Sequence, residues 1–280
     1  MNAPGRIGLI AGGGDLPVRL HGYAQHAGKR PFVLGIKGFA SEDWVEAQDG
    51  QMVSIGEIGR QIDLLRKAEC TELVIAGIVK RPDFSRLQVD LKGAAVLPKL
   101  VAAAVQGDDA LLRATIAVFE QAGFKVIGAD DLYEGLLSRS GAYTSAQPSD
   151  RDHEDIAMAL KVVRRLGELD VGQGAIVRDG VVIAVEAQEG TDAMLERCHT
   201  LTEPHHRGRG VLVKAPKPIQ ERRIDLPTLG LNTIENAHRA GLAGVAFEET
   251  GALLLDEAEM VRRANELGLF MFGIAADARS

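Results

Sequence analysis

The sequence predicts two α/β domains, and three observations indicate this fold class. At 280 residues the chain is long for one compact domain. Residues 1–130 alternate β-rich runs with helical ones, which is typical of a parallel sheet with right-handed crossovers. The second half is also α/β, but it contains a β-hairpin and has a less regular order. We therefore expect domains over residues 1–132 and 151–280, joined by a loop over residues 133–150.

The first domain should be a doubly wound parallel sheet. Short apolar runs predict buried strands at residues 6–11, 31–36, 51–55, 72–79 and 124–129. Apolar residues at helical spacing predict helices between these strands, at residues 16–28, 58–69 and 109–123. Gly28 and Gly123 stand where two of these helices should end.

The second domain should begin with an amphipathic helix at residues 155–169. A hairpin follows at 174–186, and its turn is Asp179-Gly180, a strong hairpin signal. The remaining elements are strands at residues 210–215, 244–248, 253–255 and 270–274, with helices at 233–241 and after Asp256. The joining loop is predicted because its residues are rich in Ser, Gly and Thr.

The composition is that of a soluble globular protein and argues against several classes. The formal net charge of −7 is unsuited to a nucleic-acid binder, which needs an excess of Lys and Arg. Cys70 and Cys198 are far apart and form no CxxC pair, so a disulfide scaffold and a zinc-cysteine site are disfavoured. The sequence contains no apolar run of about 18 residues and no signal-peptide core. We expect a cytosolic protein.

A glycine-rich loop, AGGGDLP at residues 11–17, follows the first strand and opens the first helix. Gly12, Gly13 and Gly14 would let the backbone approach a phosphate, where the helix N-terminus offers free N–H groups. Pro17 stands where a dinucleotide fingerprint has its third glycine, and the second strand ends without a carboxylate for a ribose. The loop therefore favours a phosphate or uridine nucleotide over NAD, with a merely tight turn as the alternative.

Two further loops carry candidate ligands. Lys80 and Arg81 follow the fourth strand, where they would face a phosphate or simply be exposed. Glu186 and Asp192, in VEAQEGTD, suit a hard cation such as Mg²⁺, which takes one or two protein carboxylates. Taken alone, a solvated acidic loop is the favoured interpretation of VEAQEGTD. In EPHHRGRG, at residues 203–210, we expect a solvated basic turn, with anion contact as the alternative.

The most unusual segment is KAPKPIQERRIDLPTLG, at residues 214–230. Around one carboxylate, Asp225, it gathers the cations Lys214, Lys217, Arg222 and Arg223. Its three prolines stiffen the backbone, which is useful where side chains must be held in place. Neighbouring cations keep an aspartate ionised, as a metal ligand must be. The segment is typical of a phosphate and metal site, with solvated loop charges as the alternative.

Six motifs, in this order, resemble the LpxI-type UDP-2,3-diacylglucosamine pyrophosphatases of Gram-negative lipid A biosynthesis. They span essentially the whole chain: AGGGDLP, GIVKRPD, GDDALLR, VEAQEGTDAMLER, VLVKAPKPIQERRIDLPTLG and NTIENAHRAGLAGVAFE. The resemblance implies an N-terminal Rossmann-like domain and a C-terminal α/β domain, with the active site between them. It also implies a hydrolase that uses a divalent cation, Mg²⁺ or Mn²⁺, and converts UDP-2,3-diacylglucosamine into UMP and 2,3-diacylglucosamine 1-phosphate.

With this resemblance we assign site roles as hypotheses. Asp225 is the central catalytic carboxylate, which binds the metal or orients the attacking water, and Glu186 and Asp192 are further metal or water contacts. Lys214 and Arg223 would hold phosphate oxygens. The remaining substrate contacts would be Gly12, Gly13, Gly14, Lys80, Thr144 and Thr233. The Asp-x-His and Gly-Asn-His-Glu signatures of calcineurin-like phosphoesterases are absent, which predicts a sparser metal site.

The partner implied by the resemblance is a lipid-linked UDP-sugar, and the implied location is cytoplasmic. Two acyl chains need an apolar slot, and VLPKLVAAAV at residues 96–105 is a candidate wall, although core packing is the favoured interpretation. The sequence leaves open both peripheral contact with the inner membrane and formation of a homodimer. Two other classes compete: a nicotinamide oxidoreductase, and a non-enzymatic carrier of lipids or nucleotide sugars.

Overall fold

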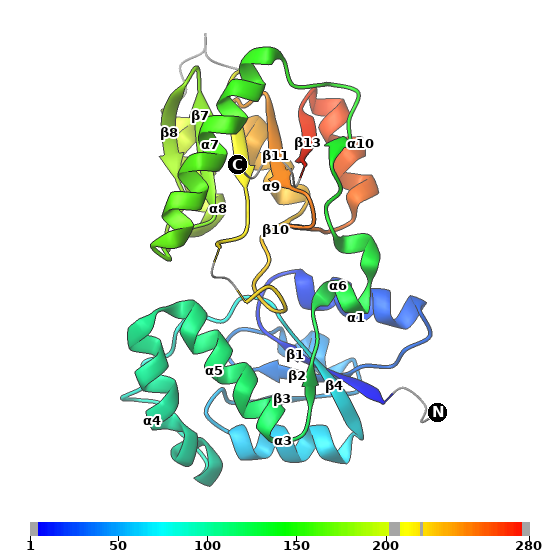
Figure 1. The fold of residues 1–280 in the computed structure, drawn as a ribbon. Helices are drawn as coiled ribbons and strands as arrows, with labels where there is room; N and C mark the ends of the chain where they lie inside the picture. The colour runs from blue at the N-terminus through cyan, green and yellow to red at the C-terminus, as the bar shows by residue number, and fades with distance from the viewer. Residues whose placement is uncertain (1–4, 202–207, 219–220, 276–280) are drawn as a thin grey trace. The chain divides into compact units, whose positions relative to one another are not determined.

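The computed structural model describes residues 5–201, 208–218 and 221–275 (Figure 1). The chain divides into two compact units. The first comprises Met1–Glu134 and Glu221–Ile224, and the second comprises Gly135–Gln220 and Asp225–Ser280. Each unit is an α/β structure with a sheet and a hydrophobic core of its own. The predicted fold class is therefore confirmed.

A five-stranded parallel sheet forms the centre of the first unit, in the order β3-β2-β1-β4-β5. Its strands are β1 (Arg6–Ala11), β2 (Phe32–Ile36), β3 (Gly50–Val53), β4 (Cys70–Ala76) and β5 (Lys125–Val126). Each strand overlaps one of the five predicted runs, because a strand covered on both faces requires a nearly continuous apolar sequence. The order is that of a doubly wound sheet, as predicted.

Among its described residues, the first unit has six α-helices. They are α1 (Leu16–His26), α2 (Glu42–Glu46), α3 (Ile58–Lys67), α4 (Leu91–Gln106), α5 (Asp108–Gln121) and α6 (Ala129–Leu132). Of these, α1, α3 and α5 correspond to the three predicted ones. In α3, Ile58, Ile62 and Leu65 recur at helical spacing and are buried in the same core cluster as the side chains of β2 and β4.

The favoured prediction of core packing for residues 96–105, within α4, is wrong for most of that stretch. Ala104 is its one buried residue, and Val96 and Leu100 pack against the core from partly exposed positions. Val101 and Val105 are exposed. This apolar stretch therefore belongs to a surface helix, and its use as a wall for acyl chains stays a prediction.

A six-stranded mixed sheet forms the centre of the second unit, in the order β6-β13-β11-β9-β7-β8. Its strands are β6 (Gly141–Ala142), β7 (Gly174–Arg178), β8 (Val181–Val185), β9 (Val211–Lys214), β11 (Gly244–Glu248) and β13 (Phe270–Ile274). The strands β9, β11 and β13 are parallel, whereas β6 and β7 run antiparallel to their neighbours. The unit thus has a parallel centre flanked by antiparallel edges.

The predicted hairpin is formed by β7 and β8, and its turn is Asp179-Gly180. Both turn residues have positive φ, of 54° and 77°, which is why Asp-Gly favours this turn. The buried Asp155 accepts hydrogen bonds from the N–H groups of Asp179 and Gly180, at 2.9 and 2.7 Å. A long helix is thereby tied to the hairpin, since Asp155 lies in α7 (Asp150–Glu168).

Three more helices and a small sheet complete the second unit as far as it is described. The helices are α8 (Gly190–Thr200), α9 (Leu231–Arg239) and α10 (Glu257–Leu267). The small sheet pairs β10 (Thr228–Leu229) with β12 (Leu253–Leu254) in parallel. Leu229, Ile234, Leu254 and Met260 from these elements are buried in one core cluster.

Most of the stretch predicted as a joining loop belongs to the fold of the second unit. The hydroxyl of the buried Ser138 donates to the Glu248 carbonyl at 2.7 Å and accepts from the Ala252 N–H at 3.1 Å. Gly141 and Ala142 pair with β13. In the part of the chain that the structure describes, no helix is long and apolar enough to cross a membrane.

Candidate active site

Three charged side chains lie at the carboxyl ends of strands in the second unit. Lys214 ends β9, Glu248 ends β11 and Glu186 directly follows β8. The strands β8 and β9 run in the same direction, because each is antiparallel to β7. All three side chains are buried. Open α/β sheets bind ligands beyond the carboxyl ends of their strands, so this edge is the candidate site.

Lys214 and Glu186 form a buried cluster with Thr191, at the start of α8. The Lys214 Nζ donates to Thr191 Oγ1 at 2.6 Å, and Thr191 Oγ1 donates to Glu186 Oε1 at 3.0 Å. The Nζ also lies 3.8 Å from Glu186 Oε2, so the two charges are paired. Glu186 Oε2 has no hydrogen-bond partner among the described residues. The ammonium 3.8 Å away therefore provides its electrostatic compensation.

Gly174 of β7 makes room for this cluster. It lies opposite Lys214 in the sheet, and its carbonyl accepts from the Glu186 N–H at 2.8 Å. A Cβ at position 174 would lie 2.4 Å from Glu186 Oε2. A larger residue would therefore displace the Glu186 carboxylate from the lysine.

The predicted roles of Glu186 and Lys214 must be weighed against this pairing. Lys214 Nζ donates one of its three hydrogens to Thr191 and faces the Glu186 carboxylate, so a phosphate would share this ammonium with both residues. Reasoning by residue type singled out the two charged members of the cluster and left out Thr191. The signal for Thr191 is its place five residues after Glu186, at the start of a helix, where its hydroxyl can reach back to the strand end.

The three carboxylates predicted for a metal do not form one centre. The Asp192 Oδ1 accepts from Asn236 Nδ2 at 2.8 Å, which joins α8 to α9. Across the described ranges, no group of three or more His, Cys, Asp or Glu side chains is arranged to hold a metal ion. One metal bound by Glu186, Asp192 and Asp225 together therefore does not fit this structure. A contact by any one of them stays a prediction.

Asp225 begins a stretch that is fixed within the second unit. Leu226 and Pro227 are buried, and the Pro227 carbonyl accepts from the Leu253 N–H at 2.8 Å. Thr228 then opens β10. The Pro227 carbonyl thus ties this end of the segment to β12, and the stiffening of the segment by its prolines stays a prediction.

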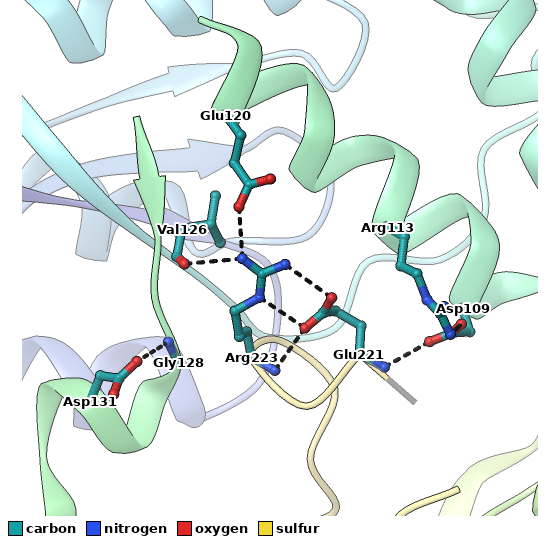
Figure 2. Close-up of polar contacts among 8 residues, drawn as sticks. All are labelled: Asp109, Arg113, Glu120, Val126, Gly128, Asp131, Glu221 and Arg223. Atoms are coloured by element: carbon teal, nitrogen blue, oxygen red, sulfur yellow. Dashed lines mark hydrogen bonds and ion pairs between the residues drawn. The ribbon is translucent and has the colours of Figure 1, made fainter. Parts of the chain in front are cut away.

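Arg223, predicted to hold a phosphate, is instead bound by carboxylates of the first unit (Figure 2). Its Nε and Nη2 donate to the two carboxylate oxygens of Glu221, at 2.9 and 3.0 Å, and its Nη1 donates to Glu120 Oε1 at 2.7 Å. The Val126 carbonyl accepts from Nη1 at 3.4 Å. Hydrogen bonds to Glu221 and then Glu120 raise the pKa of the guanidinium. The geometry gives Arg223 a structural role and does not support the predicted phosphate contact.

The neighbours of Arg223 anchor the same short segment to the first unit. The Glu221 N–H donates to Asp109 Oδ1 at 2.7 Å, and the buried Asp109 carboxylate is also paired with Arg113. Ile224 packs against the core of the first unit. Glu221–Ile224 therefore belongs to the first unit, although the chain on either side of it belongs to the second.

The glycine loop closes onto the end of β4. The Gly12 N–H donates to the Ala76 carbonyl and the Gly13 N–H to the Ile78 carbonyl, each at 2.8 Å. A Cβ at Gly12 would lie 2.7 Å from the Ile78 carbonyl oxygen, and Gly14 has a φ of +83°. The first two N–H groups are engaged within the fold, which agrees with the tight-turn alternative for them. Phosphate contact stays a prediction that rests on Gly14 and the start of α1.

Lys80 and Arg81 differ in their surroundings. Lys80 is exposed, so it stays a candidate phosphate contact. Arg81 donates to the Ala104 carbonyl and lies 3.7 Å from Asp108, which ties this loop to α4 and α5. The histidines of EPHHRGRG lie outside the described residues.

The two threonines predicted to contact substrate have partners within the second unit. Thr144 Oγ1 donates to the Ala146 carbonyl at 3.0 Å and accepts from the Met271 N–H at 2.9 Å. Thr233 Oγ1 accepts from the Gly230 N–H at 3.4 Å, at the start of α9. Both threonines are buried. The Thr144 hydroxyl thus donates and accepts within the fold and the Thr233 hydroxyl accepts, and their contact with nucleotide or sugar stays a prediction.

We expect Lys214→Met to reduce the free energy of unfolding by about 3–5 kcal/mol, because it leaves the Glu186 charge buried without its partner. Adding Glu186→Met should restore much of that loss, because the second charge is then removed as well. Urea unfolding followed by circular dichroism measures both effects. The control is Lys161→Met on the exposed side of α7. A single variant as stable as the wild type would show that the pair is not a structural element.

The ion pair with Arg223 predicts a specific pH dependence. Hydrogen bonding to Arg223 lowers the pKa of Glu221 below its ordinary value of 4.5. This stabilisation is therefore present above pH 4.5 and is lost as the pH falls through the lower folded-state pKa. We expect Glu221→Gln to lose less stability than the wild type on acidification. Urea unfolding followed by Trp44 fluorescence reports on the first unit.

The control for that measurement is Glu46→Gln, on the exposed surface of α2. Between pH 7 and acidic pH, the unfolding free energy of this control should change by as much as that of the wild type. Parallel pH profiles for the wild type and Glu221→Gln would contradict the proposed pairing.

Two family models match this chain. The LpxI N-terminal domain matches residues 6–136, and the LpxI C-terminal domain matches residues 139–272. The chain is also 46% identical over 279 residues to the UDP-2,3-diacylglucosamine pyrophosphatase LpxI of Caulobacter vibrioides, which covers 98% of this chain and 99% of that protein. The chain therefore belongs to the LpxI family, as its motifs indicated.

Proposed function

We propose that this chain hydrolyses the pyrophosphate bond of UDP-2,3-diacylglucosamine in the cytoplasm. The products would be UMP and 2,3-diacylglucosamine 1-phosphate, within lipid A biosynthesis. The observation that carries the proposal is the 46% identity to the Caulobacter pyrophosphatase, which extends over 98% of this chain and 99% of that protein. Because the models of both family domains match, the similarity extends over both halves of the chain.

The carboxyl edge of the second sheet has features that suit a diphosphate. The helix α8 begins at this edge, because it follows the carboxyl end of β8. Helix N-termini favour anions, because their first N–H groups lack partners within the helix. Attack on phosphorus needs an oriented water and stabilisation of the developing charge, and a rigid edge with a helix N-terminus supports both.

We assign the reacting centre to Asp225. Asp225 directly precedes the fixed stretch at Leu226 and Pro227, which limits the freedom of its backbone.

A divalent cation, Mg²⁺ or Mn²⁺, would be held by Asp225 together with phosphate oxygens of the substrate. Mg²⁺ is commonly bound through one or two carboxylates plus substrate phosphates, so the proposal does not need a preformed group of three ligands. When bound, the cation would offset negative charge on the diphosphate. The remaining part of the catalysis falls to the protein, which must orient Asp225 and exclude competing waters.

The first expected result is release of UMP from UDP-2,3-diacylglucosamine dispersed in detergent with Mg²⁺, measured by anion-exchange chromatography. Excess EDTA should abolish the release, and added Mg²⁺ or Mn²⁺ should restore it. Release that continues in EDTA would refute the cation requirement but support the hydrolysis. If no UMP forms under either condition while the substrate stays bound, the carrier interpretation would replace the enzyme.

Asp225→Ala should lower kcat by about 10²–10⁴-fold, because the group that orients the water or holds the cation is lost. Binding of the substrate, measured by equilibrium dialysis with Mg²⁺, should change far less. The matched control is Asp150→Ala, at the exposed start of α7. Turnover close to that of the wild type in the Asp225 variant would remove Asp225 from the mechanism.

A further inference from the structure

The helix α4 carries an apolar stripe on its solvent side. The stripe consists of Leu91, Ala94, Pro98, Val101 and Val105, all of them exposed. The intervals between them alternate between three and four residues, so they follow one face of the helix. Leu91 and Val105 are 91% and 84% exposed, values that place both side chains almost wholly in solvent.

This stripe is separate from the face that holds α4 on its unit. Val96, Leu100 and Ala104 recur every four residues and pack against the core of the first unit. The helix lies beside α5, and both are labelled in Figure 1. Packing of the fold therefore does not account for the stripe, and exposed apolar surface of this kind marks an interaction site.

The charges around the stripe indicate which partner fits. Between Leu91 and Gln106 the sequence has two lysines, Lys92 and Lys99, and no acidic residue, although the whole chain has a net charge of −7. The nearest acidic residues at the two ends are engaged: Asp90 accepts from the N–H groups of Gly93 and Arg60, and Asp108 is paired with Arg81.

A second copy of the chain fits this helix poorly. Two α4 helices packed stripe to stripe would bring lysines to both sides of the contact, and neither helix has a carboxylate to pair with them. An anionic lipid surface has the complementary charge, and it accepts apolar side chains at the boundary between headgroups and acyl chains.

We propose that α4 is the surface by which this chain docks on an anionic phospholipid bilayer. The stripe lies at the acyl boundary, and Lys92 and Lys99 lie among the headgroups. The helix rests in the plane of the surface and does not cross it. The inference rests on the proposed function in one respect, namely that a substrate with two acyl chains is carried by a bilayer. Docking brings the first unit to the membrane that holds this substrate.

The test is co-sedimentation of the full chain with large unilamellar vesicles. One set contains phosphatidylcholine with about one-third phosphatidylglycerol, and the other contains phosphatidylcholine alone. The wild type should bind the anionic vesicles more strongly and should be released by salt. Leu91→Ser with Val101→Ser and Val105→Ser should lower the partition coefficient by about tenfold or more. Lys92→Gln with Lys99→Gln should lower it by about fivefold for each lysine.

The matched control changes Leu169, Val181 and Val182 to Ser, since all three are exposed apolar residues of the second unit. It should bind vesicles as the wild type does. Because every substituted residue is exposed, unchanged melting temperatures should show that the variants are folded. Vesicle binding that is unaffected by the α4 changes, or that is equally weakened by the control, would overturn the proposal.

Two further measurements test whether the stripe binds something other than a bilayer. Sedimentation velocity would reveal a dimer that the serine variant breaks, and this result would overturn the proposal in favour of a second copy. The rate of substrate turnover by the serine variant, relative to the wild type, would also be measured in detergent micelles and on vesicles. An equal loss of rate in both would overturn the proposal, because it would show that the stripe binds the acyl chains of the substrate and not the bilayer. The vesicle assay measures binding and not UMP release. It therefore tests docking even if the proposed hydrolysis is wrong.

Discussion

The path of the segment 214–230 depends on the hydrogen bonds of Arg223. Its guanidinium binds both oxygens of Glu221, the Glu120 carboxylate and the Val126 carbonyl, so most of its donors are used within the first unit. The chain leaves β9, joins the first unit for four residues and returns to the second unit at Asp225. Contacts hold it on both sides of this excursion, since Lys217 bonds Asp170 at 2.6 Å and the Pro227 carbonyl bonds the backbone of β12. The backbone on either side of Asp225 is therefore held in place.

The cations that residue type marks as phosphate ligands are largely balanced by carboxylates within the fold. Lys214 faces Glu186, and Arg223 faces Glu221 and Glu120. A cation taken out of water without a partner is costly, whereas one that is paired and hydrogen-bonded is tolerated. With 39 acidic residues against 32 basic ones, the chain offers an internal partner to most buried cations. Such pairs hold these cations in fixed positions within their own units.

The two units differ in their chemistry, and the proposed substrate is part nucleotide and part lipid. The second unit concentrates buried polar groups at the ends of rigid strands, where a diphosphate needs well-placed partners. The first unit carries an apolar helix face that its own core does not use. Contact with lipid needs exposed apolar area more than it needs precision, and a surface helix provides that area at little cost to the fold.

By itself the sequence determined most strands of the two larger sheets, the Asp179-Gly180 hairpin and the family, but not β6, which lies in the stretch predicted as a loop. Continuous apolar runs suit strands covered on both faces, and a turn with two positive φ values favours Asp-Gly, so both signals are local. Only the tertiary structure decided that Arg223 bonds Glu120, 103 residues away, and that Thr191 bridges Lys214 and Glu186. It also decided which side of α4 meets the core. Periodicity shows which residues share a face of a helix, but long-range packing determines which face is covered.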